Sequence, residues 1–291
     1  MLVQPKIIPC REASMTNYAL YKFESVNDLV DYAKEITNNF ADEKCYEFHA
    51  KSTSWKGVDS IEKLKKWLEF GREESVNKLN KLVKINEQVF EQGKKLGYKS
   101  ERSCQGFRPS VARSIIGLPN SMYRLKYTKT PNKIINFLVD TAASRRVSSS
   151  DYEEQFTKIF NYIYSLEKKG YRCKVTALTT FTSRYAPQTY GQVYQYVIKH
   201  EYEQFNLAKM GFALTSTAFF RAFMLLLLYF NCDLEDCKVE GAGIPLYHEQ
   251  DYYPDYFAEV INLARQPNEK VVYVNYRTEI DELEKAIGKI N

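Results

Sequence analysis

The sequence predicts an α/β protein with a three-layer core, in which helices flank a largely parallel sheet. Two observations carry this prediction. Residues 133–140 and 171–181 are runs of β-branched and aromatic side chains, typical of strands that are buried on both faces. Residues 151–169, which lie between them, have the apolar spacing of an amphipathic helix, and Gly170 follows as a stop. A strand, a helix and a strand in this order form a βαβ unit, whose two strands are parallel.

Residues 1–99 predict an N-terminal α+β region. Residues 18–23 alternate polar and apolar side chains, as a strand does. Helices are expected over residues 25–38, where a serine is placed as the cap, and over residues 60–70, where a glycine follows. Residues 73–96 have the pattern of a long, lysine-rich helix.

Residues 100–291 are expected to form the α/β core domain. Glycines and prolines make the first part of this domain, residues 100–130, loop-rich in the prediction. Further elements are expected on either side of and beyond the βαβ unit: strands at residues 192–199 and 270–276, and helices at residues 203–230, 254–265 and 278–289.

One apolar segment, residues 212–230, is long enough to span a bilayer. Arg221 lies at its centre, however, and an arginine at that depth costs about 2.5–3.5 kcal/mol on insertion scales. We therefore expect a buried core helix and no membrane span. The opening residues, MLVQPKIIPCRE, lack the apolar core of a signal peptide, so secretion is not expected.

The charge is unevenly distributed along the chain. The formal net charge is +5, from 41 basic and 36 acidic residues. Residues 106–230 hold 17 basic and 7 acidic side chains, a net charge of +10, whereas residues 231–291 hold 6 and 13, a net charge of −7. This pattern suits an internal charge contact, a mixed-sign interface in a homo-oligomer or an anionic partner, and it is also compatible with an ordinary solvated surface.

Motifs that mark catalysis or cofactor binding are missing from the sequence. The six cysteines form no C-x-x-C pair, and with three histidines in the chain no zinc spacing arises. Walker A, G-x-S-x-G and H-E-x-x-H sequences do not occur. We expect a non-enzymatic protein that uses no cofactor and keeps its thiols free in a cytosolic environment.

Asp140 has the best position in the chain for binding a small ligand or a metal ion. It ends the predicted strand 133–140, and the ligands of open parallel sheets bind beyond the carboxyl ends of strands. Ser144 and the hydroxyls of Thr179 and Thr180 are candidates to join it. The alternative interpretation is that Asp140 and the neighbouring serines order the turn and cap the following helix.

A basic cluster in the middle of the chain is the candidate site for nucleic acid. Cations interleaved with tyrosines are typical of single-stranded nucleic-acid sites, because bases stack on the rings while the cations meet phosphates. The residues of this cluster are Lys126, Lys129, Arg145 and Arg146, with Tyr123 and Tyr127 among them. The chain holds 23 tyrosines, so their presence here is also compatible with ordinary packing.

Two tyrosine-rich stretches are the candidate surfaces for protein partners. Tyrosine is enriched at protein interfaces, because it is large and amphipathic and loses little entropy when it is immobilised. The candidates are Tyr185, Tyr190, Tyr194 and Tyr196 in the first stretch, and Tyr252 and Tyr253 in the second. Packing in the core is the alternative for part of the first stretch.

Residues 104–125 (CQGFRPSVARSIIGLPNSMYRL) and 135–154 (INFLVDTAASRRVSSSDYEE) resemble a family of uncharacterised phage proteins. The shared pattern is G-x-x-P-x-V followed by G-x-P-x-x-M, which here falls on Gly106, Pro109, Val111, Gly117, Pro119 and Met122. The resemblance implies a phage or prophage origin, and hence a location in the host cytoplasm. It implies no particular activity.

The same central segment is similar to a von Willebrand A-type domain, and a related Rossmann-like topology is the alternative. In a von Willebrand A-type domain the first strand ends in D-x-S-x-S, whose side chains ligate Mg²⁺. The corresponding positions here are Asp140, Ala142 and Ser144. Because an alanine replaces the middle hydroxyl, we expect no metal site, and Asp140 and Ser144 are the only candidates left for one.

These observations lead to one functional expectation and two alternatives. We expect a phage-encoded protein that binds other proteins, including copies of itself, either as an accessory assembly factor or as an inhibitor of a host defence complex. The first alternative is a nucleic-acid-binding protein that uses the basic segment, residues 106–230. The second is a metal-dependent enzyme with its centre at Asp140.

Overall fold

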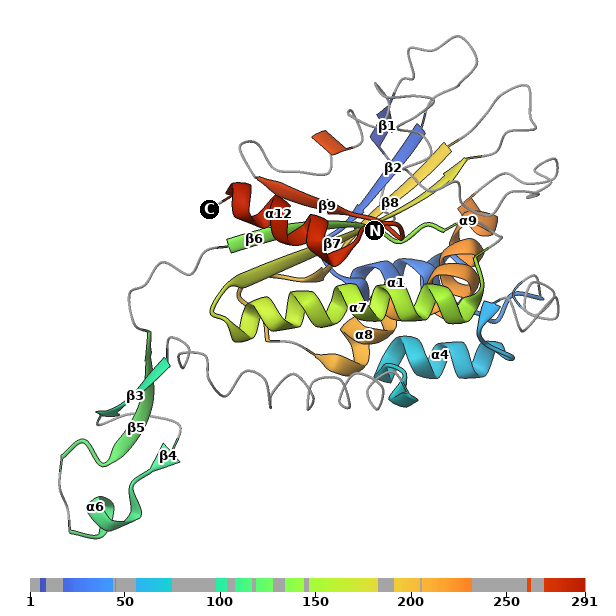
Figure 1. The fold of residues 1–291 in the computed structure, drawn as a ribbon. Coiled ribbons are helices and arrows are strands. Elements are labelled where there is room, and N and C mark those ends of the chain that lie inside the picture. The colour runs from blue at the N-terminus through green and yellow to red at the C-terminus, as the bar shows by residue number, and fades with distance from the viewer. Residues whose placement is uncertain are drawn as a thin grey trace.

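The protein builds two separate sheets. The structure is a computed structural model that describes residues 6–8, 18–43, 45, 56–74, 98–103, 108–116, 119–127, 134–143, 147–182, 191–204, 206–231, 261–262 and 270–290. These residues form a six-stranded mixed sheet with helices packed against it, and a three-stranded sheet that lies apart from it (Figure 1).

The main sheet contains two groups of parallel strands. In order across the sheet, its strands are β1 (Lys6–Ile8), β2 (Tyr18–Phe23), β8 (Gly191–Lys199), β7 (Arg172–Thr182), β6 (Ile134–Asp140) and β9 (Val271–Val274). β7, β6 and β9 are parallel to one another, β8 is parallel to β2, and the two groups meet where β7 and β8 pair antiparallel. The predicted βαβ unit is confirmed, because β6 and β7 are parallel neighbours.

Both faces of β6 are buried. Ile135, Phe137 and Val139 belong to the core cluster that also contains the described helices. Leu138 and Asp140 alternate to the opposite face and are at most 2% exposed. A strand buried on both sides needs a layer on each side, so this burial agrees with the predicted three-layer α/β core.

Serine caps and a glycine set the ends of the longer helices. These helices are α1 (Val26–Ile36), α4 (Ile61–Phe70), α7 (Ser149–Lys168) and α12 (Ile280–Ile290). The side chains of Ser25, Ser60 and Ser148 each accept a hydrogen bond from the amide three residues further on, and so begin α1, α4 and α7. Gly71 ends α4 with a φ of +83°, and a Cβ at this position would collide with the backbone of Ala208.

The apolar segment around Arg221 lies inside the fold. It forms α8 (Leu207–Thr215), the π-helix η1 (Ala218–Met224) and α9 (Leu225–Asn231). Every residue from 210 to 228 is buried, which confirms the prediction of a core helix. Within the described ranges no single helix is long and apolar enough to cross a membrane, although α8 and the helix after it pass that test as a pair bent by 73°.

Residues 98–127 form a small sheet where loops are predicted, so that prediction is wrong. The strands, in order, are β3 (Tyr98–Ser103), β5 (Met122–Tyr127) and β4 (Arg108–Pro109), all antiparallel, and a short helix, α6 (Val111–Ile115), lies between β4 and β5 in the chain. Glycines and prolines mark the connections between short strands, while β3 and β5 are rich in Arg, Lys and Ser and carry few β-branched residues. We call the described part of residues 98–127 the projecting module, because it extends away from the main sheet (Figure 1).

Some predicted elements fall largely outside the described residues. Only residues 73–74 of the long helix expected over 73–96 are described, and only residues 261–262 of the helix expected over 254–265. The division of the chain at residue 99 stays a prediction. The main sheet nevertheless joins strands from both sides of that division, because β2 pairs with β8.

Candidate functional site

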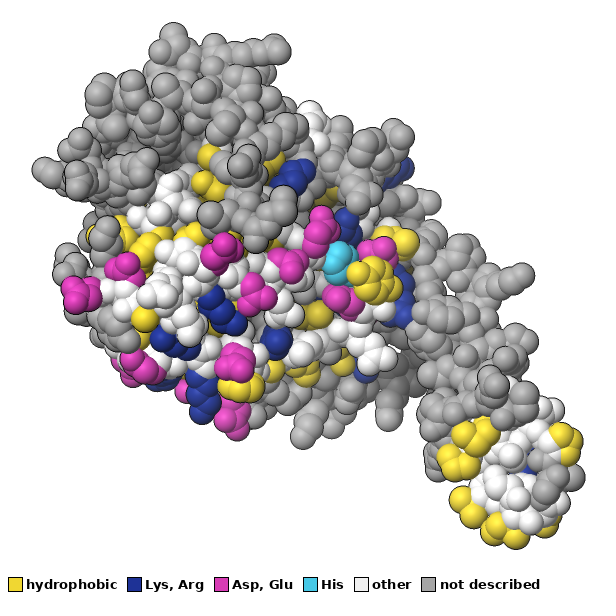
Figure 2. Space-filling model, turned by 180° about the vertical axis from the view of Figure 1, so that it is seen from behind, with side chains coloured by type: hydrophobic (Ala, Val, Ile, Leu, Met, Phe, Trp, Pro, Cys, Tyr) yellow, Lys and Arg dark blue, Asp and Glu magenta, His cyan; other side chains and the backbone are white. Residues whose placement is uncertain are grey.

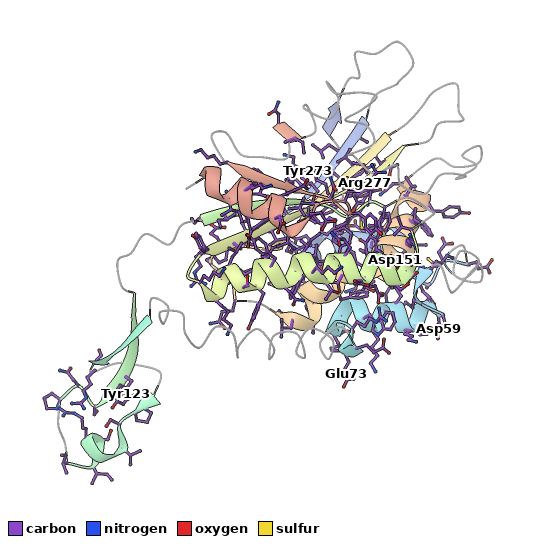
Figure 3. The ribbon with its side chains drawn as sticks, viewed as in Figure 1. Asp59, Glu73, Tyr123, Asp151, Tyr273 and Arg277 are labelled. Atoms are coloured by element: carbon purple, nitrogen blue, oxygen red, sulfur yellow. The ribbon has the colours of Figure 1, made fainter. Side chains whose placement is uncertain are left out.

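Asp140 lies at the carboxyl end of β6, and both of its oxygens accept hydrogen bonds. Oδ1 accepts from the backbone amide of Ala142 at 3.0 Å, and Oδ2 accepts from the hydroxyl of Tyr273 at 3.0 Å. Tyr273 comes from the neighbouring strand β9 (Figure 3). The carboxylate is fully buried. This geometry agrees with the interpretation that Asp140 orders the turn after the strand.

Two of the other three candidates for a metal site with Asp140 can be placed in the structure. Thr179 and Thr180 are buried in β7, and Ser144 lies outside the described residues. Among the residues that the structure describes, no group of three or more His, Cys, Asp or Glu side chains is arranged to hold a metal ion. The expectation of no metal site stays a prediction.

A buried hydroxyl network joins β6, β7, β8 and α7 behind Asp140. The hydroxyls of Thr141 and Thr179 lie 2.7 Å apart, and the Tyr196 hydroxyl lies 3.5 and 3.4 Å from them. The hydroxyl of Tyr152 donates to the backbone carbonyl of Thr141 at 3.0 Å. Burial raises the pKa of Tyr196 to about 12 and the pKa of Tyr152 well above its ordinary value. The tyrosines are therefore neutral and link the strands to the helix.

Tyr194 belongs to a second buried network. Its hydroxyl donates to Oε1 of Gln192 at 2.6 Å and accepts from Nδ2 of Asn231 at 2.8 Å, while the Tyr32 hydroxyl donates to Oδ1 of Asn231 at 2.6 Å. The ring stacks on Tyr21, with the centroids 5.0 Å apart and the planes 9° from parallel. These contacts join β2, β8, α1 and the end of α9.

The prediction that Tyr194 and Tyr196 lie on a partner-binding surface is therefore wrong. Both side chains are fully buried, because β8 lies in the interior of the main sheet and the rings pack against neighbouring strands and helices. The other four candidate tyrosines, at positions 185, 190, 252 and 253, lie outside the described residues.

The buried tyrosines predict a loss of stability at alkaline pH. Tyr196 ionises near 10.0, its ordinary pKa, in the unfolded chain but near 12 in the fold, so the unfolded chain loses its proton first. The stabilisation is complete below pH 10 and is lost as the pH rises to about 12. Urea unfolding at several pH values from 9 to 12 should show a smaller decline for Tyr196→Phe than for the wild type. The exposed Tyr202→Phe serves as the control, and equal declines in all three proteins would contradict the assignment.

The projecting module carries exposed aliphatic side chains at its outer end. Val111 is 65% exposed, Ile115 is 78% exposed and Ile116 is 67% exposed. Figure 2 shows apolar side chains gathered at the end of the module that is farthest from the main body. We call these three residues the apolar tip. Val111 belongs to the G-x-x-P-x-V pattern, but none of the three was predicted from the sequence to be a functional residue. The available signal was two isoleucines between turn residues in a polar, basic stretch.

Backbone contacts hold the apolar tip in place. The guanidinium of Arg113 donates to the carbonyl of Pro119 at 3.3 Å, and the amide of Ser110 donates to the carbonyl of Ser121 at 2.7 Å. Of the module side chains whose burial the structure describes, only Ser103 is buried. The module therefore presents Val111, Ile115 and Ile116 outward.

The projecting module is also strongly basic. Residues 98–127 hold six Lys or Arg side chains and one Glu, a net charge of +5. Arg102 is exposed and pairs across the ladder with Tyr123, which is labelled in Figure 3. Lys126, a predicted nucleic-acid contact, lies in β5 opposite Lys99. The other three predicted contacts, Lys129, Arg145 and Arg146, lie outside the described residues.

A groove of about 330 Å³ lies where β8 ends and α1 and α8 begin. Two of its polar side chains contact other protein groups. Nε2 of His200 lies 2.9 Å from the carbonyl oxygen of Glu24, and Nζ of Lys209 donates to Oδ1 of Asn27 at 3.5 Å. The His200 ring stacks on the exposed ring of Tyr202. These contacts connect the two helix starts to the end of the strand.

The fold and these surfaces define a mixed α/β protein with a buried, hydrogen-bonded strand-end edge and a basic projecting module. The chain belongs to the family DUF7192, a domain of unknown function, whose profile it matches over residues 6–287. Comparison with curated proteins and with solved structures gave no significant match. Membership in a family without an assigned activity agrees with the expectation from the sequence, while the phage origin and the von Willebrand A-like core stay predictions.

Proposed function

We propose that this protein acts by binding another protein through the apolar tip of the projecting module, and that it catalyses no reaction. The observation that carries the proposal is the exposure of three large aliphatic side chains, Val111, Ile115 and Ile116, within six residues of sequence. Contiguous exposed apolar side chains that are rimmed by polar residues mark interaction sites in many soluble proteins. The module that carries them also holds six Lys or Arg side chains, which we call the basic rim, and their charge favours a partner with an acidic surface.

The apolar tip is large enough to make a useful contribution to affinity. Full burial of a valine or isoleucine contributes about 1.5–3 kcal/mol, so the exposed parts of three such side chains contribute roughly 3–6 kcal/mol. A micromolar complex corresponds to about 8 kcal/mol. The tip would thus supply a large share of such a complex, and the basic rim would add steering and orientation.

The proposal retains the biological setting that the resemblance implied. A phage-encoded accessory assembly factor and an inhibitor of a host defence complex both work by occupying a surface of another protein. The buried strand-end edge supports a non-enzymatic role, because the oxygens of Asp140 and the hydroxyls of Thr141 and Thr179 are hydrogen-bonded to one another or to neighbouring protein groups.

Replacement of Ile115 and Ile116 by aspartate is expected to abolish capture of the partner. The affinity should fall at least about tenfold, because two aspartates replace the apolar contact and add like charge against an acidic partner. The measurement is affinity capture from the cells in which the protein acts, with bound proteins identified by mass spectrometry. Phe70→Asp is the matched control, since Phe70 is 63% exposed on α4 of the main body.

One result would decide against this proposal. Equal capture by the wild type and by the Ile115→Asp, Ile116→Asp variant would exclude the apolar tip as the binding surface. A variant that loses its circular dichroism signal would prompt the milder pair Ile115→Ser and Ile116→Ser, which keeps the same prediction of weakened capture.

A nucleic-acid-binding function is the second candidate, and the net charge of +5 on residues 98–127 favours it. Binding that depends on phosphate contacts must weaken steeply as salt increases. Micromolar binding of a labelled oligonucleotide at 0.15 M salt, lost when Lys126 is replaced by alanine and weakened when Arg145 and Arg146 are, would favour this function over the first. Binding that is unaffected by these substitutions would count against the nucleic-acid-binding function.

A further inference from the structure

The exposed face of α12 carries charge opposite to that of the projecting module. Leu283 and Ile287 are buried in the core cluster and hold the helix against the main body. Asp281, Glu282 and Glu284 are exposed carboxylates on the helix, Glu279 is an exposed carboxylate directly before it, and the exposed Lys285 lies among them. We call the four carboxylate residues the acidic face.

The acidic face already has contacts within the chain: Oε2 of Glu282 accepts a hydrogen bond from the amide of Glu279 at 3.3 Å, and the charge of Glu279 acts on Lys158. None of its four carboxylates forms an ion pair with a basic side chain among the described residues. In a single chain, α12 lies at the edge of the main sheet next to β9, and the projecting module extends away from it (Figure 1). Each surface is thus left for a contact with another molecule.

The sign of the charge decides between possible contacts of two copies. Two projecting modules that met tip to tip would bring together two net charges of +5, and like charges that face each other disfavour association. A module that meets an acidic face brings opposite charges together. The contact that charge allows is therefore between different surfaces of the two copies.

We propose that the apolar tip of one copy docks on the main body of a second copy beside its acidic face, with the basic rim of the module paired to those carboxylates. The inference rests on the proposed function and names the partner as a second copy of this chain. Since the two contacting surfaces differ, each copy retains one free module and one free acidic face. Association then continues into a chain or closes into a ring.

The experiment uses two full-length charge-reversed proteins. One carries Arg102→Glu, Arg124→Glu and Lys126→Glu, which changes the net charge of residues 98–127 from +5 to −1. The other carries Asp281→Lys and Glu284→Lys, which makes its α12 basic. Light scattering coupled to size-exclusion chromatography measures association over a concentration series at low and at high salt. Each variant alone should associate at least about tenfold more weakly than the wild type, because its module and its α12 then have the same sign.

An equimolar mixture of the two variants should associate again. In the mixture, the module of each variant can contact an α12 of opposite charge on the other variant. Recovery in the mixture also shows that both variants are folded. The Ile115→Asp, Ile116→Asp variant should stay monomeric, and Phe70→Asp should associate like the wild type.

Three outcomes would overturn the inference. The first is a wild type that is monomeric up to about 100 μM. The second is a mixture of the charge-reversed proteins that does not associate. The third is an Ile115→Asp, Ile116→Asp variant that associates as strongly as the wild type. The wild type could be monomeric while the Ile115→Asp, Ile116→Asp variant no longer binds a foreign protein or an oligonucleotide that the wild type binds. In that case the self-docking inference fails, but the apolar tip remains a binding surface. The two proposals can therefore fail separately.

Discussion

Replacement of Glu167 by alanine is expected to lower the free energy of unfolding by about 3–5 kcal/mol, because it leaves a buried ammonium group without its carboxylate. Nζ of Lys199 lies 2.6 Å from Oε1 of Glu167, and the lysine side chain is fully buried. The same carboxylate oxygen accepts a hydrogen bond from the amide of Cys173 at 2.9 Å. The contact thus joins the end of α7 to the start of β7 and the end of β8.

A double substitution separates the pair from its surroundings. Glu167→Leu combined with Lys199→Met removes both charges, and we expect it to be more stable than Glu167→Ala alone, because no unpaired charge stays buried. Glu154→Ala is the control, since the Glu154–Lys158 pair is largely exposed and exposed pairs contribute little to stability. Urea unfolding followed by circular dichroism measures all of these values. A loss of less than 1 kcal/mol for Glu167→Ala would contradict the burial of the pair.

Tyr194→Ala is expected to destabilise the protein by about 3–5 kcal/mol, the range for loss of a large buried side chain. The substitution removes a ring that stacks on Tyr21 and a hydroxyl that contacts Gln192 and Asn231. Tyr194→Phe keeps the ring and removes only the hydroxyl, so it should lose about 1–3 kcal/mol. Thermal and urea unfolding measure both losses.

Tyr202→Ala is the matched control for this prediction. Tyr202 is 71% exposed, so its removal should change stability by no more than about 0.5 kcal/mol. A Tyr194→Ala protein with wild-type stability and impaired partner binding would indicate that Tyr194 lies on the surface. Such a result would revive the interpretation that the buried position now contradicts.

The elements that could be predicted from the sequence are those with a local signal. Runs of β-branched and aromatic residues predict the strands β6 and β7, and apolar spacing predicts the helix α7 between them. The parallel pairing of β6 and β7 was therefore predictable. Ser25 and Ser60 mark the starts of their helices in the same local way. The projecting module has no such signal, because β3 and β5 consist mainly of basic, polar and tyrosine residues.

The contacts of the candidate sites could not be predicted, because they join residues that are far apart in the chain. Asp140 was recognised as a strand end, but its partner Tyr273 lies 133 residues further on. Tyr194 is suited by composition both to an interface and to a core, and only the position of β8 inside the sheet decides between them. The pairing of Glu167 with Lys199 likewise depends on how α7 returns to β8.

The base of the projecting module has a consequence for how such a protein can arise and change. Tyr98 and Tyr127, at its two ends, pair with each other in the ladder, so the chain enters and leaves the module at neighbouring points. An element with adjacent ends can be inserted into, or removed from, a host fold without displacing the strands that flank it. The main sheet consists of strands that pair with one another and includes none from the module. The module and the main sheet can thus be inherited separately, and the sequence of the module can change without altering the strand pairing of the main sheet.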